Sequence, residues 1–142
     1  MKSLKDTQHY DKVIQELNYP FADIYIFKGF IVSEVKEGIT FTWEDHAKVI
    51  IDDVVGFLDT NGEDLIYISH RIHSYSVIAS DWTKFFKMSY GLKGYGVVGY
   101  NNTSFLNSMV EKLFFKNKIK HFTELDIAID WATNKVLEKV SA

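Results

Sequence analysis

The sequence predicts an α/β fold: a mixed, mostly parallel β-sheet with an N-terminal hairpin and helices on both faces. Short apolar runs bounded by turn residues alternate with segments whose apolar residues recur at helical spacing. Such alternation implies right-handed crossovers between parallel strands. Two strands come before the first helical segment, so the sheet should be mixed. The predicted order is β-β-α-β-α-β-α-β-α, in one domain at residues 21–142 after a polar lead-in at residues 1–20.

The strand signals are clearest in the first two thirds of the chain. Residues 21–35 read as two strands that reverse at Lys28-Gly29, where glycine supplies the positive φ that a tight turn needs. Residues 65–69 form a short apolar run after a turn, which is typical of a buried central strand. We expect this strand to lie parallel to residues 97–99, which belong to the next strand at 92–100.

The two edges of the sheet have weaker signals. Residues 118–122 read as a short strand whose lysines favour an edge position, since charges deter pairing with other chains. The lead-in, which ends at Pro20, is expected to add an edge strand or a helical turn.

Four helices are expected, and each begins at a residue type that caps helices, namely Thr42, Ser80-Asp81, Asn101 and Thr123. In each helix the apolar residues at helical spacing are predicted to face the core. In the first two helices these are Ala47, Ile51, Val54 and Leu58, and then Trp82, Phe85 and Phe86. In the last two they are Phe105, Met109, Val110 and Leu113, and then Ile127, Ala128, Trp131, Ala132 and Val136. The residues expected to be largely buried include Ile51, Val98, Phe105 and Trp131.

Composition excludes several classes of protein. Hydrophobic residues make up 46% and charged residues 25% of the chain, which is typical of a globular domain and too apolar for disorder. The net charge of −3 argues against a protein whose main function is to hold nucleic acid phosphates. Without cysteine there are no disulfides, thiol nucleophiles or Cys-ligated metals. No signal peptide or bilayer-spanning run is visible, so we expect a cytoplasmic protein without a membrane span.

The stretch Gly94-Tyr95-Gly96-Val97-Val98-Gly99 matches the letters of a dinucleotide-binding motif. In that motif the glycines follow a strand and open a helix. Here they run through the strand, and the helix begins only after Asn101. We therefore interpret the glycines as positions where a Trp or Phe from a neighbouring layer packs closely, and we expect no cofactor.

Neither a metal site nor a catalytic site is indicated. His70 and His73 would point to opposite faces of a strand, and no third ligand is signalled near them. The serines of residues 69–76 lack the Gly-x-Ser-x-Gly elbow of a hydrolase nucleophile. Asp45 and Asp52 lie on the solvated face of an amphipathic helix. We therefore expect no enzyme activity.

Four lysines, at positions 112, 116, 118 and 120, surround Phe114 and Phe115 and imitate a basic and aromatic nucleic acid patch. Lysines near the end of a helix also complement its dipole without any ligand. Because the chain as a whole is acidic, no nucleic acid partner is expected.

The exit of the central strand is the candidate surface for a partner or ligand, since the crevice beyond the strand ends is where open α/β sheets bind. Its residues are His70, Arg71, His73, Ser74, Tyr75 and Ser76. Arg71 is the only arginine of the chain, and its planar fork suits a bond that lysine cannot copy. It is expected either to bind a carboxylate of the same chain, the favoured alternative, or to meet an acidic partner or phosphate.

The order of elements resembles the STAS domain, in particular its SpoIIAA-like branch. The tail from Lys120-His121-Phe122 to Trp131 looks like the ending of that branch, and residues 93–99 stand where its penultimate core strand would be. Anti-sigma antagonists of this family carry a phosphorylated serine after an aspartate. Here the stretch reads His73-Ser74-Tyr75-Ser76, without an acidic neighbour, so the resemblance does not carry over the phosphoswitch.

The resemblance implies a non-catalytic regulatory or protein-interaction module. The alternative is a binder of a small apolar or lipid-like molecule, because related domains are compared with lipid carriers and this chain is rich in aromatic rings. A deep apolar cavity would favour the binder, and a flat exposed patch beyond the central strand would favour the module.

Overall fold

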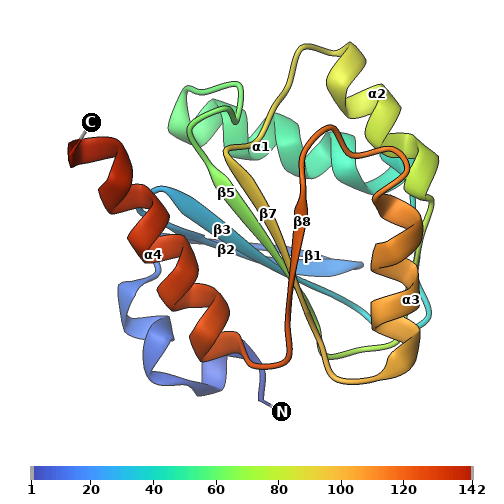
Figure 1. Ribbon diagram of the computed structural model, residues 1–142, viewed down its shortest axis with the longest axis horizontal. Coiled ribbons are helices and arrows are strands. Elements are labelled where there is room, and N and C mark those ends of the chain that lie inside the picture. Colours follow the sequence, from blue (N-terminus) through green and yellow to red (C-terminus); the bar gives the residue numbers. More distant parts are fainter. Residues whose placement is uncertain (1, 142) are drawn as a thin grey trace.

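The computed structural model describes residues 2–141, with side chains as far as Leu137. The chain forms an α/β fold around a six-stranded mixed sheet with the strand order β1-β2-β3-β5-β7-β8 (Figure 1). Strands β1 to β3 are antiparallel, and β3, β5, β7 and β8 are parallel. The strands are β1 (Gln15–Tyr19), β2 (Ala22–Phe27), β3 (Phe30–Val35), β5 (Ile66–Arg71), β7 (Gly94–Gly99) and β8 (Ile119–Phe122). The predicted fold class is confirmed.

The lead-in packs as part of the same domain. It contains two 3-10 turns, at Leu4–Asp6 and Gln8–Lys12, and the edge strand β1. Leu4 is fully buried in the core, and β1 pairs with β2 along its whole length. The first twenty residues therefore supply both of the features expected of them and join the sheet.

The central strand lies where the sequence places it. Strand β5 is between β3 and β7, and Ser69 faces Val97 across the parallel pair. The hairpin before it turns at Gly29, whose φ is 83°. Strand β8 forms the far edge of the sheet, as predicted from its lysines. A separate ladder joins β4 (Thr40–Phe41) to β6 (Ser76–Val77).

The helices are α1 (Lys48–Leu58), α2 (Trp82–Lys87), α3 (Asn102–Glu111) and α4 (Leu125–Ser141), with short turns η3 (Trp43–Ala47) and η4 (Ala79–Asp81) before the first two. Thr42 and Asn101 cap as predicted: their side chains accept from the backbone N–H groups of Asp45 and Ser104, at 3.2 and 2.9 Å. Asp81 instead accepts from the backbone N–H of Trp43 at 2.7 Å, which ties η4 to η3.

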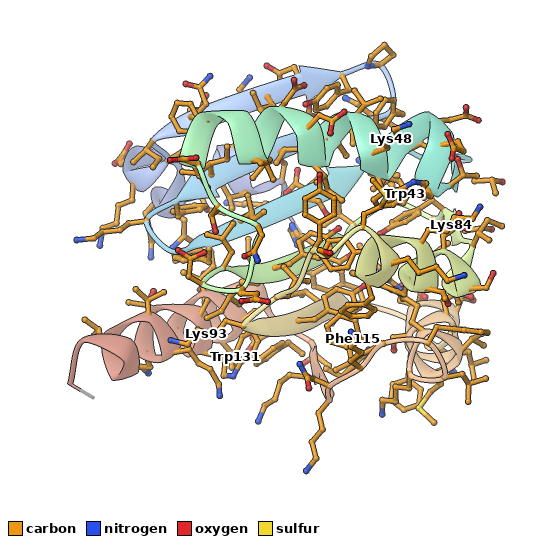
Figure 2. All side chains as sticks on the ribbon, turned by 90° about the horizontal axis from the view of Figure 1, so that it is seen from above. Trp43, Lys48, Lys84, Lys93, Phe115 and Trp131 are labelled. Atoms are coloured by element: carbon orange, nitrogen blue, oxygen red, sulfur yellow. The ribbon has the colours of Figure 1, made fainter. Side chains whose placement is uncertain are left out.

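Helices cover both faces of the sheet. Figure 2 shows α1 and α4 on opposite sides of the strands. Helix α4 packs on a cluster that includes Val32, Ile66 and Ile68, and α1 packs on Ile24 and Val35 of the other face. Helices α2 and α3 lie over the face of β7 that carries Tyr95, so the cavity described below is closed from that side.

Two of the three glycines of β7, Gly94 and Gly96, make room for aromatic rings, as predicted, whereas Gly99 makes room for Ser104. A Cβ at Gly94 would lie 3.3 Å from the ring of Trp131, and one at Gly96 would lie 2.9 Å from that ring and 3.0 Å from Phe122. Trp131 thus packs from α4 onto the bare backbone of β7 (Figure 2). Val98 beside these glycines is fully buried.

The prediction for α3 is wrong. Phe105 is 44% exposed, and the rest of the expected stripe is exposed with it. The buried face carries Ser104, Ser108 and Glu111 instead. Two contacts explain this orientation. Glu111 bonds to Arg71 in the interior, and Ser104 packs closely on Gly99. A Cβ added to Gly99 would lie only 2.7 Å from the Cβ of Ser104.

The predicted burial of Ile51 and of the apolar residues of α4 is confirmed only in part. Trp131 and Ile51 are half-buried, although both were expected to be largely buried. Ile127, which was expected to face the core, is 51% exposed, whereas Ala128 and Ala132 of the same helix are fully buried. The buried face of α4 is formed by Leu125, Ala128, Ile129 and Ala132, which leaves Ile127 on the outer side and Trp131 at the margin.

Candidate functional site

A cavity of 130 Å³ lies between the sheet and helices α1 and α2. Its walls are mostly apolar and come from both layers; they include Ile24, Ile31, Ile50, Val54, Leu65 and Phe85. The cavity runs along β5, because Leu65, Tyr67, Ser69 and Arg71 all line it. Alternate residues of one strand point to one face, so this strand supplies an apolar start and a polar end.

The polar end is a buried ion pair between Arg71 and Glu111. Arg71 donates from Nη2 to Glu111 Oε2 at 2.5 Å and to the Tyr95 hydroxyl at 2.9 Å, and from Nε to Ser69 Oγ at 3.0 Å. Glu111 Oε1 accepts from the Tyr95 hydroxyl at 2.7 Å and from Trp82 Nε1 at 2.9 Å. Both oxygens of the carboxylate are therefore bonded, and the two charges cancel inside the protein.

The phenols around this pair remain protonated. Burial raises the pKa of Tyr67, and burial together with Glu111 raises the pKa of Tyr95. Burial alone would lower the pKa of Arg71, but Tyr75, Tyr95 and Glu111 hold it well above its usual value. The polar end consequently consists of protonated phenols around the guanidinium of Arg71, whose charge Glu111 neutralises.

One of those donors is unused. Nη1 of Arg71 is buried and has no hydrogen-bond partner among the described residues. The guanidinium lies over the ring of Tyr75, 5.6 Å from its centroid, and Tyr75 donates to or accepts from Ser69 Oγ at 2.9 Å. A buried donor without a partner costs about 1–3 kcal/mol, so an acceptor bound in the cavity would recover that free energy.

The predicted site residues do not form one surface. His70 and Arg71 are 1% and 5% exposed, and they point to opposite faces of β5. His73, Ser74 and Ser76 are exposed, and Tyr75 is half-buried at the cavity wall. A contiguous exposed patch from His70 to Ser76 is therefore absent. Arg71 and Tyr75 are the two predicted residues that the structure brings together at the cavity.

His70 belongs to a closed cluster on the other face. Its Nδ1 bonds to Glu34 Oε2 at 2.8 Å, and its Nε2 bonds to the Tyr100 hydroxyl at 2.7 Å. Glu34 also accepts from the backbone N–H of Leu4 at 2.8 Å and from Ser3 Oγ at 2.6 Å. This cluster fastens the N-terminal segment to the sheet through Glu34. Both imidazole nitrogens of His70 are bonded within it.

Sequence reasoning found Arg71 and missed its partners. The expectation of a carboxylate in the same chain is confirmed by Glu111, but no pattern indicated that Tyr95 bonds to Arg71 or that Trp82 bonds to Glu111. A signal for Glu111 exists in the sequence, since it is the only acidic residue between positions 102 and 123. It also follows Ser104 and Ser108 at helical spacing, which places the three on one face of α3.

The chemistry available at the cavity is hydrogen-bond donation next to an apolar wall. Ser69 Oγ contacts Arg71 and Tyr75, and neither is a general base that would activate a serine. Within the described residues, no three His, Asp or Glu side chains converge as metal ligands. In the same part of the chain, no helix is both long and apolar enough to cross a membrane.

Comparisons of the chain with models of protein families, with curated proteins and with solved structures found no match. The resemblance to the STAS domain accordingly stays a prediction from the sequence.

Proposed function

We propose that this protein binds a small, mainly apolar molecule in the cavity beside β5. The observation that carries the proposal is an apolar cavity whose polar end holds a buried donor, Nη1 of Arg71, without a hydrogen-bond partner among the described residues. Binding sites for small molecules combine an apolar wall with a few polar groups that fix the orientation of the ligand. The arrangement of Ile24, Val54 and Phe85 around Arg71 has this composition.

The volume limits the size of the ligand. An apolar cavity of about 150 Å³ is large enough to hold benzene. The cavity here, at 130 Å³, suits a single ring or a short branched chain. A long acyl chain exceeds this space, so of the small apolar and lipid-like ligands considered from the sequence we favour the small one.

The charge of the polar end favours an uncharged head group. Glu111 already neutralises Arg71, and a second carboxylate would lie near the first in a medium that solvates charge poorly. A hydroxyl or carbonyl oxygen can accept a hydrogen bond from Arg71 without adding charge. The ligand class that fits best is therefore a small phenol, ketone or alcohol.

The alternative, a protein-interaction module that uses the strand exit, has less support. It requires His70 and Arg71 at the surface, where a partner could contact them. Both are buried, and only His73, Ser74 and Ser76 of that stretch are exposed.

The test is calorimetric titration of the purified protein with phenol, cyclohexanone and benzoate. We expect saturable binding of an uncharged probe and weaker binding of benzoate. Replacing Ala47, which lines the cavity, by Phe should fill the space and abolish binding. The matched control is Val49→Phe, at a residue of α1 that is 41% exposed and does not line the cavity. Absence of saturable binding by every probe, or equal binding by both variants, would refute the proposal.

A further inference from the structure

Helix α3 and the turn after it expose an apolar surface, the α3 patch. Its residues are Phe105, Leu106, Met109, Val110, Leu113 and Phe114, and their exposed fractions range from 38% to 77%. Single exposed apolar residues are ordinary, but a contiguous group on a small domain marks a surface that contacts something else. Figure 1 shows α3 at one edge of the fold, on the far side from α4.

The patch exists because the polar side of α3 faces inward. Ser104, Ser108 and Glu111 are buried, and Glu111 is held by Arg71. The helix therefore has the reverse of the usual arrangement, in which the apolar stripe packs on the core. Because the ion pair fixes this orientation, the exposed stripe is a built feature of the fold.

Positive charge borders the patch. Lys112, Lys116, Lys118 and Lys120 are all exposed, and none forms an ion pair with a described residue. The only carboxylate between positions 102 and 123 is the buried Glu111. Lys112 and Lys116 lie at the C-terminal end of α3 beside the patch, whereas Lys120 pairs with Gly96 in the sheet and faces α4. A chain with a net charge of −3 thus carries two cations without ion-pair partners among the described residues next to its apolar surface.

We propose that the α3 patch docks onto an anionic lipid bilayer, with its apolar side chains in the interface and the lysines among the head groups. Exposed Leu, Phe, Met and Val bordered by lysines is the composition of surfaces that bind peripherally to membranes. Lysine stems also lie along apolar surface while the ammonium stays at the polar boundary. The proposal goes beyond ligand binding in the cavity and does not depend on it.

Two other occupants fit the surface less well. A second copy of the chain, related by a two-fold axis, would bring Lys112 and Lys116 of one copy toward those of the other. A protein partner is disfavoured because lysine is depleted in protein interfaces, whereas here it is the dominant charged residue. Charge complementarity therefore selects an anionic lipid surface.

The test is co-sedimentation with vesicles of phosphatidylcholine containing phosphatidylserine, compared with vesicles of phosphatidylcholine alone. We expect binding to the anionic vesicles and at least a tenfold weaker partition onto the neutral ones. The double variant Leu106→Gln/Leu113→Gln changes the two most exposed residues of the patch, at 62% and 77%, so folding should not suffer. Its partition should fall by about tenfold or more, since buried leucine area is lost.

Matched variants separate the patch from the rest of the surface. Ile14→Gln/Phe57→Gln alters residues that are 54% and 49% exposed elsewhere, and it should bind like the unmodified protein. Lys112→Gln/Lys116→Gln, at two exposed positions beside the patch, should weaken binding by roughly thirtyfold, from the usual contribution of each cation near an anionic surface. Lys12→Gln/Lys28→Gln is the charge-matched control.

Three outcomes would overturn the proposal. They are no binding to anionic vesicles, equal loss in the patch variants and their controls, and a dimer in solution that Leu106→Gln/Leu113→Gln dissociates. The last outcome would assign the patch to a second copy. Retained probe binding in the cavity by the same variants would show that the two functions are independent.

Discussion

His70 and Arg71 are neighbours on β5, and each belongs to a buried polar cluster on a different face of the sheet. On the α4 side, His70 and Glu34 have hydrogen-bond partners at every titratable nitrogen and carboxylate oxygen, and the cluster ends in the packed N-terminal segment. On the other side, Arg71 and Glu111 stand at the end of a cavity, and Nη1 of Arg71 has no partner among the described residues.

The difference separates scaffold from site. A fully bonded buried cluster has no capacity left for a ligand, and its function is to hold chain segments together. An incompletely bonded cluster beside empty apolar volume has both a donor and a place for an acceptor. Both clusters are buried, so the distinguishing features are the unused donor and the cavity.

The largest expected effect is on the Arg71 side. Arg71→Met or Glu111→Leu alone leaves an unpaired buried charge, and each should lower the free energy of unfolding by about 3–5 kcal/mol. The double variant removes both charges and should lose much less than the sum. Urea denaturation measures all three.

The exposed pair of Lys48 and Glu44, 4.0 Å apart, is the control for this cycle. Lys48→Met should change the free energy of unfolding by less than about 1 kcal/mol, as exposed pairs do. If the losses at Arg71 and Glu111 were additive, the two residues would not act as a pair.

A smaller effect is expected on the His70 side. Glu34→Gln replaces an acceptor by an amide donor among Ser3, Leu4 and His70, which should cost about 1–3 kcal/mol. The N-terminal segment should also exchange its amide hydrogens faster, because its anchor is weakened. Glu37→Gln, at an exposed position nearby, is the control. Unchanged protection of residues 3–12 would mean that Glu34 does not fasten this segment.

The smallest effect tests the shape of the guanidinium. Arg71→Lys keeps the charge opposite Glu111 but cannot reach Ser69, Tyr95 and Glu111 together, as the planar fork does. We expect a loss of about 1 kcal/mol in a thermal or chemical denaturation midpoint, the scale of a hydrogen bond. An unchanged midpoint would show that a point charge is sufficient at this position.

The order of elements could be predicted from the sequence because its causes are local. The turn at Gly29, the caps at Thr42 and Asn101 and the apolar run of β5 act through neighbouring residues. The close packing at Gly96 was also predictable, because glycine within a strand leaves room that a ring can fill.

The site itself could be predicted only in part. Arg71 was identifiable as the one arginine of the chain, but the cavity depends on how α1, α2 and the sheet meet, which no local pattern records. The orientation of α3 was missed because a hydrophobic stripe was assumed to face inward. The ion pair between Arg71 and Glu111, 40 positions apart, and the close packing of Ser104 on Gly99 outweigh that stripe.

The inward position of Glu111 makes α3 a locally frustrated element. Its apolar residues favour one rotation of the helix about its axis, and the Arg71 contact imposes another. The native rotation of the helix is therefore set by Arg71 on another element, so its orientation depends on tertiary contacts rather than on its own hydrophobic stripe.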